Sequence, residues 1–478
     1  MPSHSEILAR LTELREADAP THGGHVLSYV YDSGLAELDE LAAQAMRLVQ
    51  PVNGLDPTTF TSVAVMEREV VGFARDLLAG GAADVVGTVT TGGTESCLLA
   101  VKTARDTFAG SGEPRLLAPV TVHAAFQKAA HYFGLVLDLV PVRADGTVSA
   151  SDLIDRMGPD VALVVVSAPS YPQAALDPVA LVAAAASERG IPCHVDACIG
   201  GWVLPFWSGL EPWDLTVPGV TSLSADLHKF GYAPKGASVL LQRGRDRQRA
   251  QYFATTRWPG YPVVNPTMLG SKSAGPLAAA WAITQALGTD GLRALAESCE
   301  RSTRALVSLI NDIDGLRVVG APVGPLLAIA ADESVPAERR VDPHHWADQA
   351  RAHGWVLQLQ PGLTQSDGTH LAPTTHLTIT PVTEGVLPAL SEALAQAAEE
   401  VRGVPSVDIL PLLGQLPALE GPLDSDTAYA LLQGFGIGSG QSALPDRMAP
   451  LLALMEALPA PVAERLLTEL LARLVEPS

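Results

Sequence analysis

Residues 222–236, SLSADLHKFGYAPKG, place a lysine directly after a histidine and ahead of an aromatic, glycine-containing turn. Most lysines lie at the surface, where the ammonium stays in water and needs no such neighbours. A lysine held among apolar and aromatic groups loses hydration, which lowers its pKa and frees the amine to form an imine with a carbonyl compound. Lys229 is therefore the first candidate catalytic residue.

A second candidate is the stretch VTTGGTESCLLA at residues 89–100. Its strand-like start and its glycine pair predict a sharp turn into a helix, where free backbone N–H groups and the positive end of the helix dipole could hold a phosphate. Glycine permits the close approach that this requires. The alternative is a tight strand-to-helix turn with Thr94 as the N-cap and no ligand.

A third candidate is Asp196, which ends the apolar segment IPCHVDA. A carboxylate buried at a strand end needs a cation or a hydrogen-bond donor beside it, and a protonated ring nitrogen would serve. Otherwise the residue caps the next loop. An anion-binding turn, a buried aspartate and a lysine, in this order, describe a pyridoxal-phosphate site with the phosphate at the turn, the pyridinium on Asp196 and the aldehyde on Lys229.

These residues need a scaffold that brings strand ends together. Between about residues 85 and 245, short apolar runs such as VALVVVSAP and ASVLLQR alternate with helical segments such as DPVALVAAAASERG. That alternation predicts an α/β fold, and the continuous apolar runs predict a mainly parallel sheet of seven strands with helices on both faces. In such folds the ligand chemistry lies at the carboxyl ends of the strands.

The sequence divides into four predicted parts. Residues 1–60 have the pattern of two helices and a loop, and residues 61–305 form the large cofactor-binding domain. A smaller C-terminal α/β domain with its own helix occupies residues 306–403. The Pro-rich stretch after it opens a helical C-terminal extension at residues 404–478.

Composition narrows the choice of partner. The formal net charge of −21 over 478 residues would repel a nucleic-acid backbone or an anionic membrane surface, so we expect a small molecule or another protein. The charged, amphipathic N-terminus lacks the apolar core of a secretion signal, and we predict a cytoplasmic protein without a membrane anchor. The four cysteines have no C-x-x-C spacing, which predicts reduced core residues rather than disulfides or a metal site.

A set of stretches resembles the fold-type-I pyridoxal-phosphate enzymes of the group II decarboxylase superfamily, and most closely their sphingosine-1-phosphate lyase branch. They run through nearly the whole chain in family order: TTGGTESCLLAVKTARD, VHAAFQKAAHYFG, VSAPSYPQAALDPV, HVDACIGGWVLPF, SLSADLHKFGYAPKGASVLL, NPTMLGSKSAG, THLTITPV and, more loosely, GQSALPDR. The resemblance implies a pyridoxal-phosphate enzyme that acts on a small amino substrate as a homodimer with shared active sites.

The resemblance also implies roles for single residues. Lys229 would bond the cofactor, Asp196 would pair with the pyridine nitrogen, and His123 would lie over the ring face. Tyr171 and Lys235 fit a lyase-like proton relay and anion contact. The other implied cofactor contacts are Gly93, Thr94 and His228 on the phosphate, Ser167 near the phenolic oxygen, and Ser271 or Lys272 across a dimer interface.

On the substrate side the sequence departs from the lyase branch. That branch has N-x-L-H-P, with a histidine toward the substrate phosphate, whereas this chain keeps Asn53 but has Asp56 in the histidine's place. The branch's G-x-V-Tyr stretch ends here in Leu27, although Tyr29 and Tyr31 follow and could substitute. An acid beside a dianionic phosphate is unfavourable by about 1–4 kcal/mol for unit charges in contact. A polar amino acid fits better.

We therefore predict a carbon–carbon lyase acting as an amino-acid decarboxylase, with Asn53, Asp56, Tyr29 and Lys235 near the substrate. Retro-aldol cleavage of a phosphorylated amino alcohol, as in sphingosine-1-phosphate lyases, is the alternative. An aminotransferase and a non-catalytic cofactor-binding protein are further alternatives. The complete catalytic set, with Tyr171 included, argues against a non-catalytic role.

Overall fold

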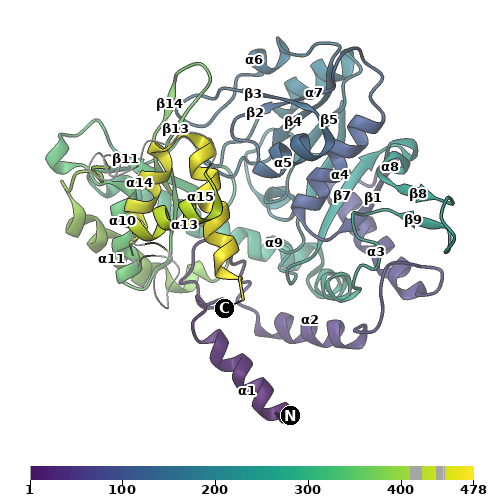
Figure 1. Cartoon of the computed structure of the whole chain (residues 1–478), viewed down its shortest axis with the longest axis horizontal. Coiled ribbons are helices and arrows are strands. Elements are labelled where there is room, and N and C mark those ends of the chain that lie inside the picture. Colours follow the sequence, from purple (N-terminus) through teal and green to yellow (C-terminus); the bar gives the residue numbers. More distant parts are fainter. Residues whose placement is uncertain (1, 410–422, 436, 438–444, 446, 478) are drawn as a thin grey trace.

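The computed structural model describes residues 2–409, 423–435, 437, 445 and 447–477. They form two lobes, both contacted by one long helix, α9 (Gly275–Asp312) (Figure 1). Apart from residues 445 and 447, the GQSALPDR stretch lies outside the described residues.

The large lobe is built on a seven-stranded sheet. Its strand order is β1 (Val85–Thr90), β7 (Ser238–Arg243), β6 (Val220–Ala225), β5 (Cys193–Asp196), β4 (Val161–Ser167), β2 (Arg115–Pro119) and β3 (Val136–Val140). Strands β6, β5, β4, β2 and β3 run parallel, whereas β7 pairs antiparallel with both β6 and β1. The carboxyl ends of the parallel strands therefore meet along one edge of the sheet.

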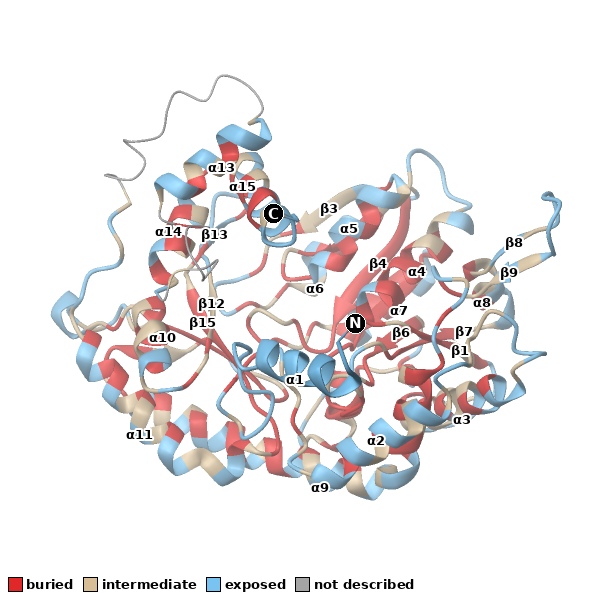
Figure 2. Cartoon of the chain, turned by 60° about the horizontal axis from the view of Figure 1, so that its bottom comes forward, coloured by how far each residue is buried: buried red, intermediate tan, exposed pale blue. Residues whose placement is uncertain are grey.

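Helices bury both faces of this sheet, which explains why apolar residues predominate in its strands (Figure 2). Leu163 and Val165 of β4 pack in a core with residues of α4 (Gly93–Asp106) and α5 (Ala124–Phe133). Their neighbours Val164 and Val166 point the other way, because side chains alternate along a strand. That second core contains residues of α3 (Thr61–Leu78), α7 (Val179–Glu188) and the start of α9.

Shorter elements complete the large lobe. Helices α6 (Ala150–Ile154) and α8 (Arg245–Gln251) follow β3 and β7, and α8 leads into a protruding hairpin, β8 (Phe253–Thr255) and β9 (Val263–Asn265). Helix α9 then runs from this lobe to the small one, with a break in helical geometry at Gly288, whose φ is +55°.

The small lobe contains a four-stranded antiparallel sheet. Its order is β10 (Leu316–Val318), β11 (Leu326–Ala331), β15 (Thr374–Thr378) and β12 (Gln358–Gln360). Helices α10 (Pro343–Ala352) and α11 (Thr383–Val401) pack on it around the fully buried Trp346 and Leu390. A short hairpin, β13 (Leu363–Thr364) and β14 (His370–Leu371), connects β12 to β15.

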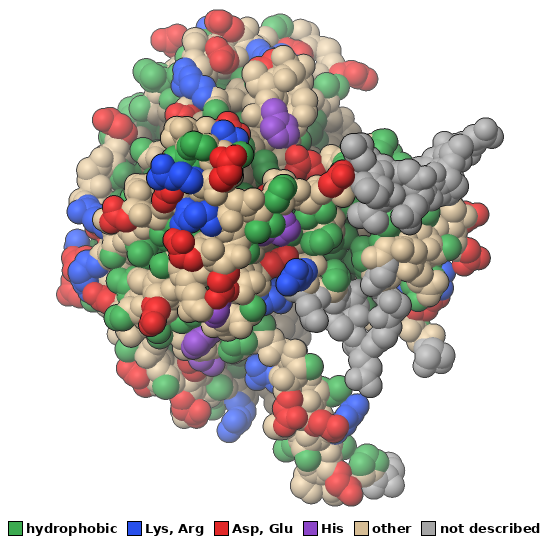
Figure 3. Space-filling model, turned by 90° about the vertical axis from the view of Figure 1, so that its left-hand side faces the viewer, with side chains coloured by type: hydrophobic (Ala, Val, Ile, Leu, Met, Phe, Trp, Pro, Cys, Tyr) green, Lys and Arg blue, Asp and Glu red, His purple; other side chains and the backbone are tan. Residues whose placement is uncertain are grey.

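Helices at both ends of the chain pack outside these sheets. Helix α1 (His4–Arg15) has no buried residue, whereas α2 (Ala36–Leu48) packs along α9. Near the C-terminus α13 (Ser425–Gly434), α14 (Ala449–Ala457) and α15 (Ala460–Leu474) share a small apolar core. Within the described residues, every helix is too short or too polar to cross a bilayer. Acidic and basic side chains are interspersed on the face shown in Figure 3.

The predicted fold, a mainly parallel seven-stranded sheet with a smaller C-terminal α/β domain, is confirmed. The apolar stretches VALVVVSAP, IPCHVDA and ASVLLQR contain strands β4, β5 and β7 of the sheet. Helix α9 crosses the predicted boundary at residue 305, so the two lobes share an element there. The predicted domain bounds themselves stay predictions.

Candidate active site

Lys229 lies between β6 and β7, where its ammonium meets a carboxylate that the sequence analysis did not consider. Its Nζ is 2.9 Å from Oδ2 of Asp226, and Nε2 of His228 lies 3.5 Å from the same oxygen. Burial alone would lower the pKa of Lys229, but the charge of Asp226 outweighs burial and raises that pKa well above its usual value. The prediction of a lowered lysine pKa is therefore wrong for this structure.

Asp226 forms the floor of the site. Its side chain is almost fully buried, and burial alone would raise its pKa. The charge of Lys229 and the hydrogen bond from His228 hold that pKa far below the usual range instead. Asp226 is therefore ionised at neutral pH and keeps the lysine amine and the histidine ring in place beside one another.

The turn between β1 and α4 contacts Asp226 of this ion pair. Gly92 is the N-cap of α4, with a φ of +149°, and the helix begins at Gly93, so Thr94 lies in the first turn rather than at the N-cap. A Cβ on Gly93 would stand 2.5 Å from Oδ2 of Asp226 and 2.9 Å from Sγ of Cys198. Only glycine fits at that contact, and its absent side chain leaves the helix N-terminus open.

Asp196 ends β5 in the same layer. Its Oδ1 accepts a 3.0 Å hydrogen bond from the backbone N–H of Cys198, with the hydroxyl of Ser224 at 3.5 Å. The Sγ atoms of Cys97 and Cys198 and a carboxylate oxygen of Asp196 lie within 4.8 Å of one another. Burial raises the pKa of the Cys97 thiol, and the hydrogen bond with Cys97 followed by burial raises that of Cys198. Both are neutral, free thiols that wall the site.

Two cavities meet at Lys229. The first, of about 570 Å³, is lined by the turn at Gly93 and Thr94 and by His123, His228 and Lys229. His123 is the N-cap of α5, where its Nδ1 accepts a 3.2 Å hydrogen bond from the N–H of Ala125. The structure thus brings together the residues predicted to hold the phosphate and the ring face.

The second cavity, of about 250 Å³, opens on the other side of Lys229. The predicted residues Tyr29, His123, Ser167, Tyr171, Asp196 and Lys229 all line it. Ser167 donates its N–H to the buried carboxyl of Asp177 at 2.7 Å, and burial raises the pKa of that carboxyl to about 7. Because His123, Ser167 and Asp196 are predicted contacts of the cofactor ring, this cavity would hold that ring and a substrate beside it.

Two residues of this cavity region were missed by sequence reasoning. The phenol of Tyr171 donates a 2.5 Å hydrogen bond to Oε1 of Gln358, and its ring stacks on His376 with centroids 4.2 Å apart. Both partners come from the small domain, from β12 and β15. A glutamine in WVLQLQ and a histidine in THLTITPV carry no local sign of a site, because only the fold places them beside Tyr171.

Lys235 lies behind the second cavity. Its Nζ is 4.4 Å from the centre of the Tyr31 ring and donates to the carbonyl of His228 at 3.1 Å. Loss of water, followed by the positive charge of Lys229, lowers the pKa of Lys235 to about 8. Tyr31 lines the cavity itself, so it stands between the ammonium and the pocket.

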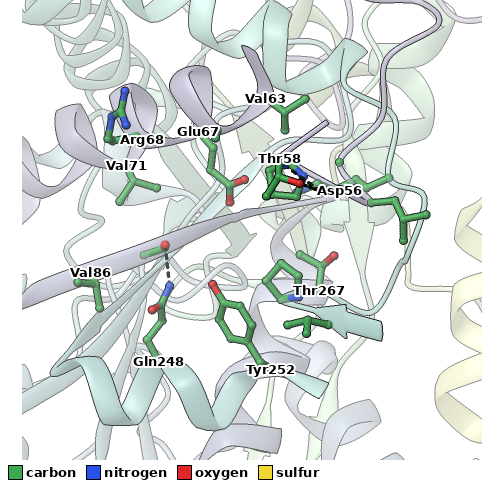
Figure 4. A pocket seen from close by; sticks show the side chains of 18 of the residues that line it. Asp56, Thr58, Val63, Glu67, Arg68, Val71, Val86, Gln248, Tyr252 and Thr267 are labelled. Atoms are coloured by element: carbon green, nitrogen blue, oxygen red, sulfur yellow. Dashed lines mark hydrogen bonds between the residues drawn. The ribbon is translucent and has the colours of Figure 1, made fainter. Parts of the chain in front are cut away.

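The remaining predicted residues lie elsewhere, around a groove of about 1310 Å³ beside β1 (Figure 4). Asp56 uses both carboxylate oxygens in its own turn, accepting from Thr58 and Thr59. Lys272 donates to the carbonyl of Val89 at 2.5 Å, and its backbone carbonyl accepts from Gly54. Asn53 forms an isolated antiparallel β-bridge with Ser273, two residues after Ser271. Within one chain, Asn53, Asp56, Ser271 and Lys272 form a second group apart from the two cavities.

The residues at Lys229 fit pyridoxal phosphate. The glycine turn leaves the N-terminus of α4 free for an anion, as the close approach of Gly93 to Asp226 shows. Asp196 offers a carboxylate to the adjoining second cavity, and Lys229 lines both cavities with its amine available to an aldehyde once it loses its proton. These groups would hold the phosphate, the ring nitrogen and the aldehyde carbon in turn.

Comparison with known proteins supports this assignment. Residues 32–326 match the family described as "Pyridoxal-dependent decarboxylase conserved domain", and residues 407–473 match "Pyridoxal-dependent enzyme, C-terminal putative HTH domain". The first description names a pyridoxal cofactor, which confirms the cofactor prediction. Much of the second match, including residues 410–422, lies outside the described residues.

Similar proteins carry one recurring name. The chain is 34% identical over 337 residues, 69% of its length, to a sphingosine-1-phosphate lyase of Dictyostelium discoideum, and 32% identical over 87% of its length to the one of Arabidopsis thaliana, covering 75% of that protein. The solved sphingosine-1-phosphate lyase of Burkholderia pseudomallei superposes with a TM-score of 0.76 at 32% identity, over 84% of this chain and 92% of that one. The chain spans 61–63% of the Dictyostelium, rat and mouse lyases.

Proposed function

Because the chain belongs to the pyridoxal-dependent decarboxylase family, in the branch of the sphingosine-1-phosphate lyases, we propose that it cleaves a phosphorylated amino alcohol. The bond broken joins the amine-bearing carbon to the neighbouring hydroxyl-bearing carbon, and the products are an aldehyde and a small amino phosphate. The observation that carries the proposal is the 32–34% identity to lyases of that name.

Within one chain, the geometry gives no support to the main argument for decarboxylation. That argument rested on Asp56 and Leu27 standing where lyases have a phosphate-facing histidine and a tyrosine. Asp56 is occupied in its own turn beside the groove, and Leu27 is buried in the small-domain core with its N–H bonded to Val356. Tyr29 and Tyr31 line the cavity at Lys229. Among the described residues of one chain, Asp196 is the only acidic side chain that lines that cavity, and Asp56 does not line it.

Bound pyridoxal phosphate supplies an electron sink for the pair released when a bond at the amine-bearing carbon breaks. The chain's own residues provide the rest. Asp226 keeps the amine of Lys229 next to the aldehyde position, and Asp196 offers a negative charge that favours a protonated ring nitrogen. Tyr171 lines the cavity where a substrate hydroxyl would lie, and the choice of bond follows from how such contacts orient the substrate.

A product assay tests the proposed reaction. The purified holoenzyme is incubated separately with sphingosine-1-phosphate, with shorter 2-amino-3-hydroxyalkyl phosphates and with a panel of free amino acids, and products are identified by mass. We expect a fatty or alkyl aldehyde with phosphoethanolamine, and no aldehyde from the Lys229→Ala protein. Faster release of carbon dioxide and an amine from any amino acid would replace the proposal by decarboxylation.

The groove beside β1 supports a homodimer, which we propose as the working form. The adjoining β8–β9 hairpin, which protrudes from the large lobe, and the loop after it carry exposed large apolar side chains: Phe253, Trp258, Tyr261, Val264, Met268 and Leu269, of which the last two also line the first cavity at Lys229. A second copy that inserts its hairpin at the groove would cover both features by two-fold symmetry. Asn53, Asp56, Ser271 and Lys272 would then lie at the interface, available to a partner's site.

Sedimentation at micromolar concentration tests the dimer. The double variant Trp258→Ser, Tyr261→Ser should dissociate into single chains, whereas Leu181→Ser, which changes a 63% exposed leucine on α7, should not. Mixing Lys229→Ala chains with Lys272→Met chains should restore part of the activity if sites are shared. A single-chain mass with full activity overturns this part of the proposal. We also propose that the protein is cytoplasmic, which cell fractionation can test.

A further inference from the structure

One face of the small-domain sheet holds the side chain of Tyr171. Gln358 on β12 and His376 on β15 are directly opposite one another in the antiparallel register, so their side chains share that face. Gln358 accepts the phenol proton at 2.5 Å, and His376 stacks under the ring with an interplanar angle of 26°. Tyr171 belongs to the large domain, so this cross-strand pair reaches over the domain boundary to a residue of the cavity.

We propose that Gln358 is a positioning residue that selects the substrate by fixing which way the Tyr171 hydroxyl donates. A phenol has one proton and can also accept. With the proton committed to Oε1 of Gln358, the oxygen of Tyr171 has only lone pairs to offer, to the neighbouring hydroxyl of Thr378 and to the cavity. It therefore suits a substrate hydroxyl, which donates, and disfavours a carboxylate or ketone oxygen, which can only accept. This inference rests on the proposed cleavage of an amino alcohol.

The surroundings of Tyr171 hold it in the neutral, proton-donating form. Burial raises its pKa well above the usual value, so the phenol does not ionise at neutral pH. His376 is fully buried and burial lowers its pKa to about 3, so an uncharged ring lies under the phenol. Nε2 of His376 lies 3.2 Å from the hydroxyl of Thr378, which keeps the imidazole in its plane. The phenol thus orients a substrate hydroxyl and does not act as a base.

The alternative is the opposite polarity, in which the amide group of Gln358 donates to Tyr171 and leaves the phenol proton free for the cavity. The two arrangements differ by a flip of one amide, and a substitution can separate them. A glutamate at position 358 can accept but cannot donate when ionised. A leucine can do neither. Gln360, two residues along β12, gives a matched control, because its side chain bonds Thr374 instead.

The experiment measures binding of two ligands that differ at one position. A 2-amino-3-hydroxyalkyl phosphate can donate from its hydroxyl, whereas the 3-oxo analogue can only accept. All proteins carry Lys229→Ala, which prevents turnover, and are loaded with pyridoxal phosphate; dissociation constants come from calorimetry. The parent, Gln358→Glu and Gln360→Leu should each prefer the hydroxyl ligand by about three- to tenfold, the worth of one neutral hydrogen bond. Gln358→Leu should lose that preference.

Two outcomes overturn the inference. The inference fails if Gln358→Leu keeps the preference for the hydroxyl ligand, because Tyr171 would then need no partner. It fails also if the parent prefers the 3-oxo ligand and Gln358→Glu reverses that preference, because the glutamine would then donate to Tyr171 rather than accept from it. Turnover with Lys229 intact is measured separately. If no aldehyde forms, the proposed reaction fails, yet the binding ratios still report on the polarity of Tyr171.

Discussion

The sequence predicted functional residues at two places, the cavities at Lys229 and the groove at Asp56. In the structure only the first set lines a common site within one chain. At Lys229, residues from five strand ends and turns, spread over more than a hundred positions, converge within one chain. Asp56 and Lys272 line the groove, with Asn53 and Ser271 close to them in the chain, and none of the four lines the cavities at Lys229. The difference teaches that a motif tied to a strand end predicts its own location, whereas a loop motif predicts only that it belongs to some site.

Of the changes proposed at the two places, removing Lys229 should have the largest effect on activity. Lys229→Ala takes away the amine that bonds the cofactor and should reduce turnover by about 10⁴-fold or more. The glycine turn and Asp196 remain, so the protein should still bind pyridoxal phosphate without a covalent link. Absorption before and after borohydride reduction, with peptide mapping of the parent, checks this. A reduced adduct on any other lysine would shift the site away from these cavities.

Asp226→Asn should have the second largest effect, here on stability, because it leaves the buried ammonium of Lys229 without its counter-ion. Breaking such a pair costs about 3–5 kcal/mol in the free energy of unfolding. Folding lowers the pKa of Asp226 and raises that of Lys229. The pair's contribution is therefore complete between the unfolded pKa values of about 3.9 and 10.4. It is lost as the pH falls through the folded pKa of Asp226 or rises through that of Lys229. Denaturant unfolding of the apoprotein against pH measures it, and a flat difference between the two proteins over pH 2–11 would contradict it.

Gly93→Ala tests whether the open N-terminus of α4 binds the phosphate, and we expect an effect of intermediate size. The new methyl group would collide with Asp226 and Cys198, so we expect a loss of about 1–3 kcal/mol in stability and weaker cofactor binding. Gly72→Ala is the control, because that glycine lies within α3 with open space around it and should gain about 0.5–1 kcal/mol. Thermal unfolding with and without pyridoxal phosphate separates the two effects. Unchanged cofactor affinity in Gly93→Ala would place the phosphate elsewhere.

The smallest expected effect is at the groove. Asp56→Asn keeps an acceptor for the turn at Thr58 and Thr59, so affinity for a phosphorylated ligand should change by about threefold at most. An increase of tenfold or more would show that the carboxylate reaches a partner's cavity and opposes the phosphate there. Competition binding with and without the dimer-breaking hairpin variant distinguishes the two cases.

The sequence predicted those parts of the fold and of the site that depend on local patterns of residues. Short apolar runs predicted the sheet, and Gly93, Asp196 and Lys229 followed because each ends or follows a strand whose position was already implied. Asp226 was overlooked although it lies three residues from Lys229, because the neighbours considered were aromatic and apolar. Gln358 and His376 lay beyond reach, since their roles arise from a register between β12 and β15 and from the packing of two domains.

Strand β1 lies at one edge of the large sheet, and the groups along this edge affect whether single chains aggregate before they form dimers. An uncovered edge strand is a template on which foreign strands add and aggregates grow. Here three side chains saturate it: Glu67 accepts from the N–H of Val89, Lys272 donates to the carbonyl of Val89, and Gln248 donates to that of Gly87. A newly synthesised chain is thereby shielded from edge-to-edge polymerisation, and a correct neighbour must dock through side chains rather than by extending the sheet.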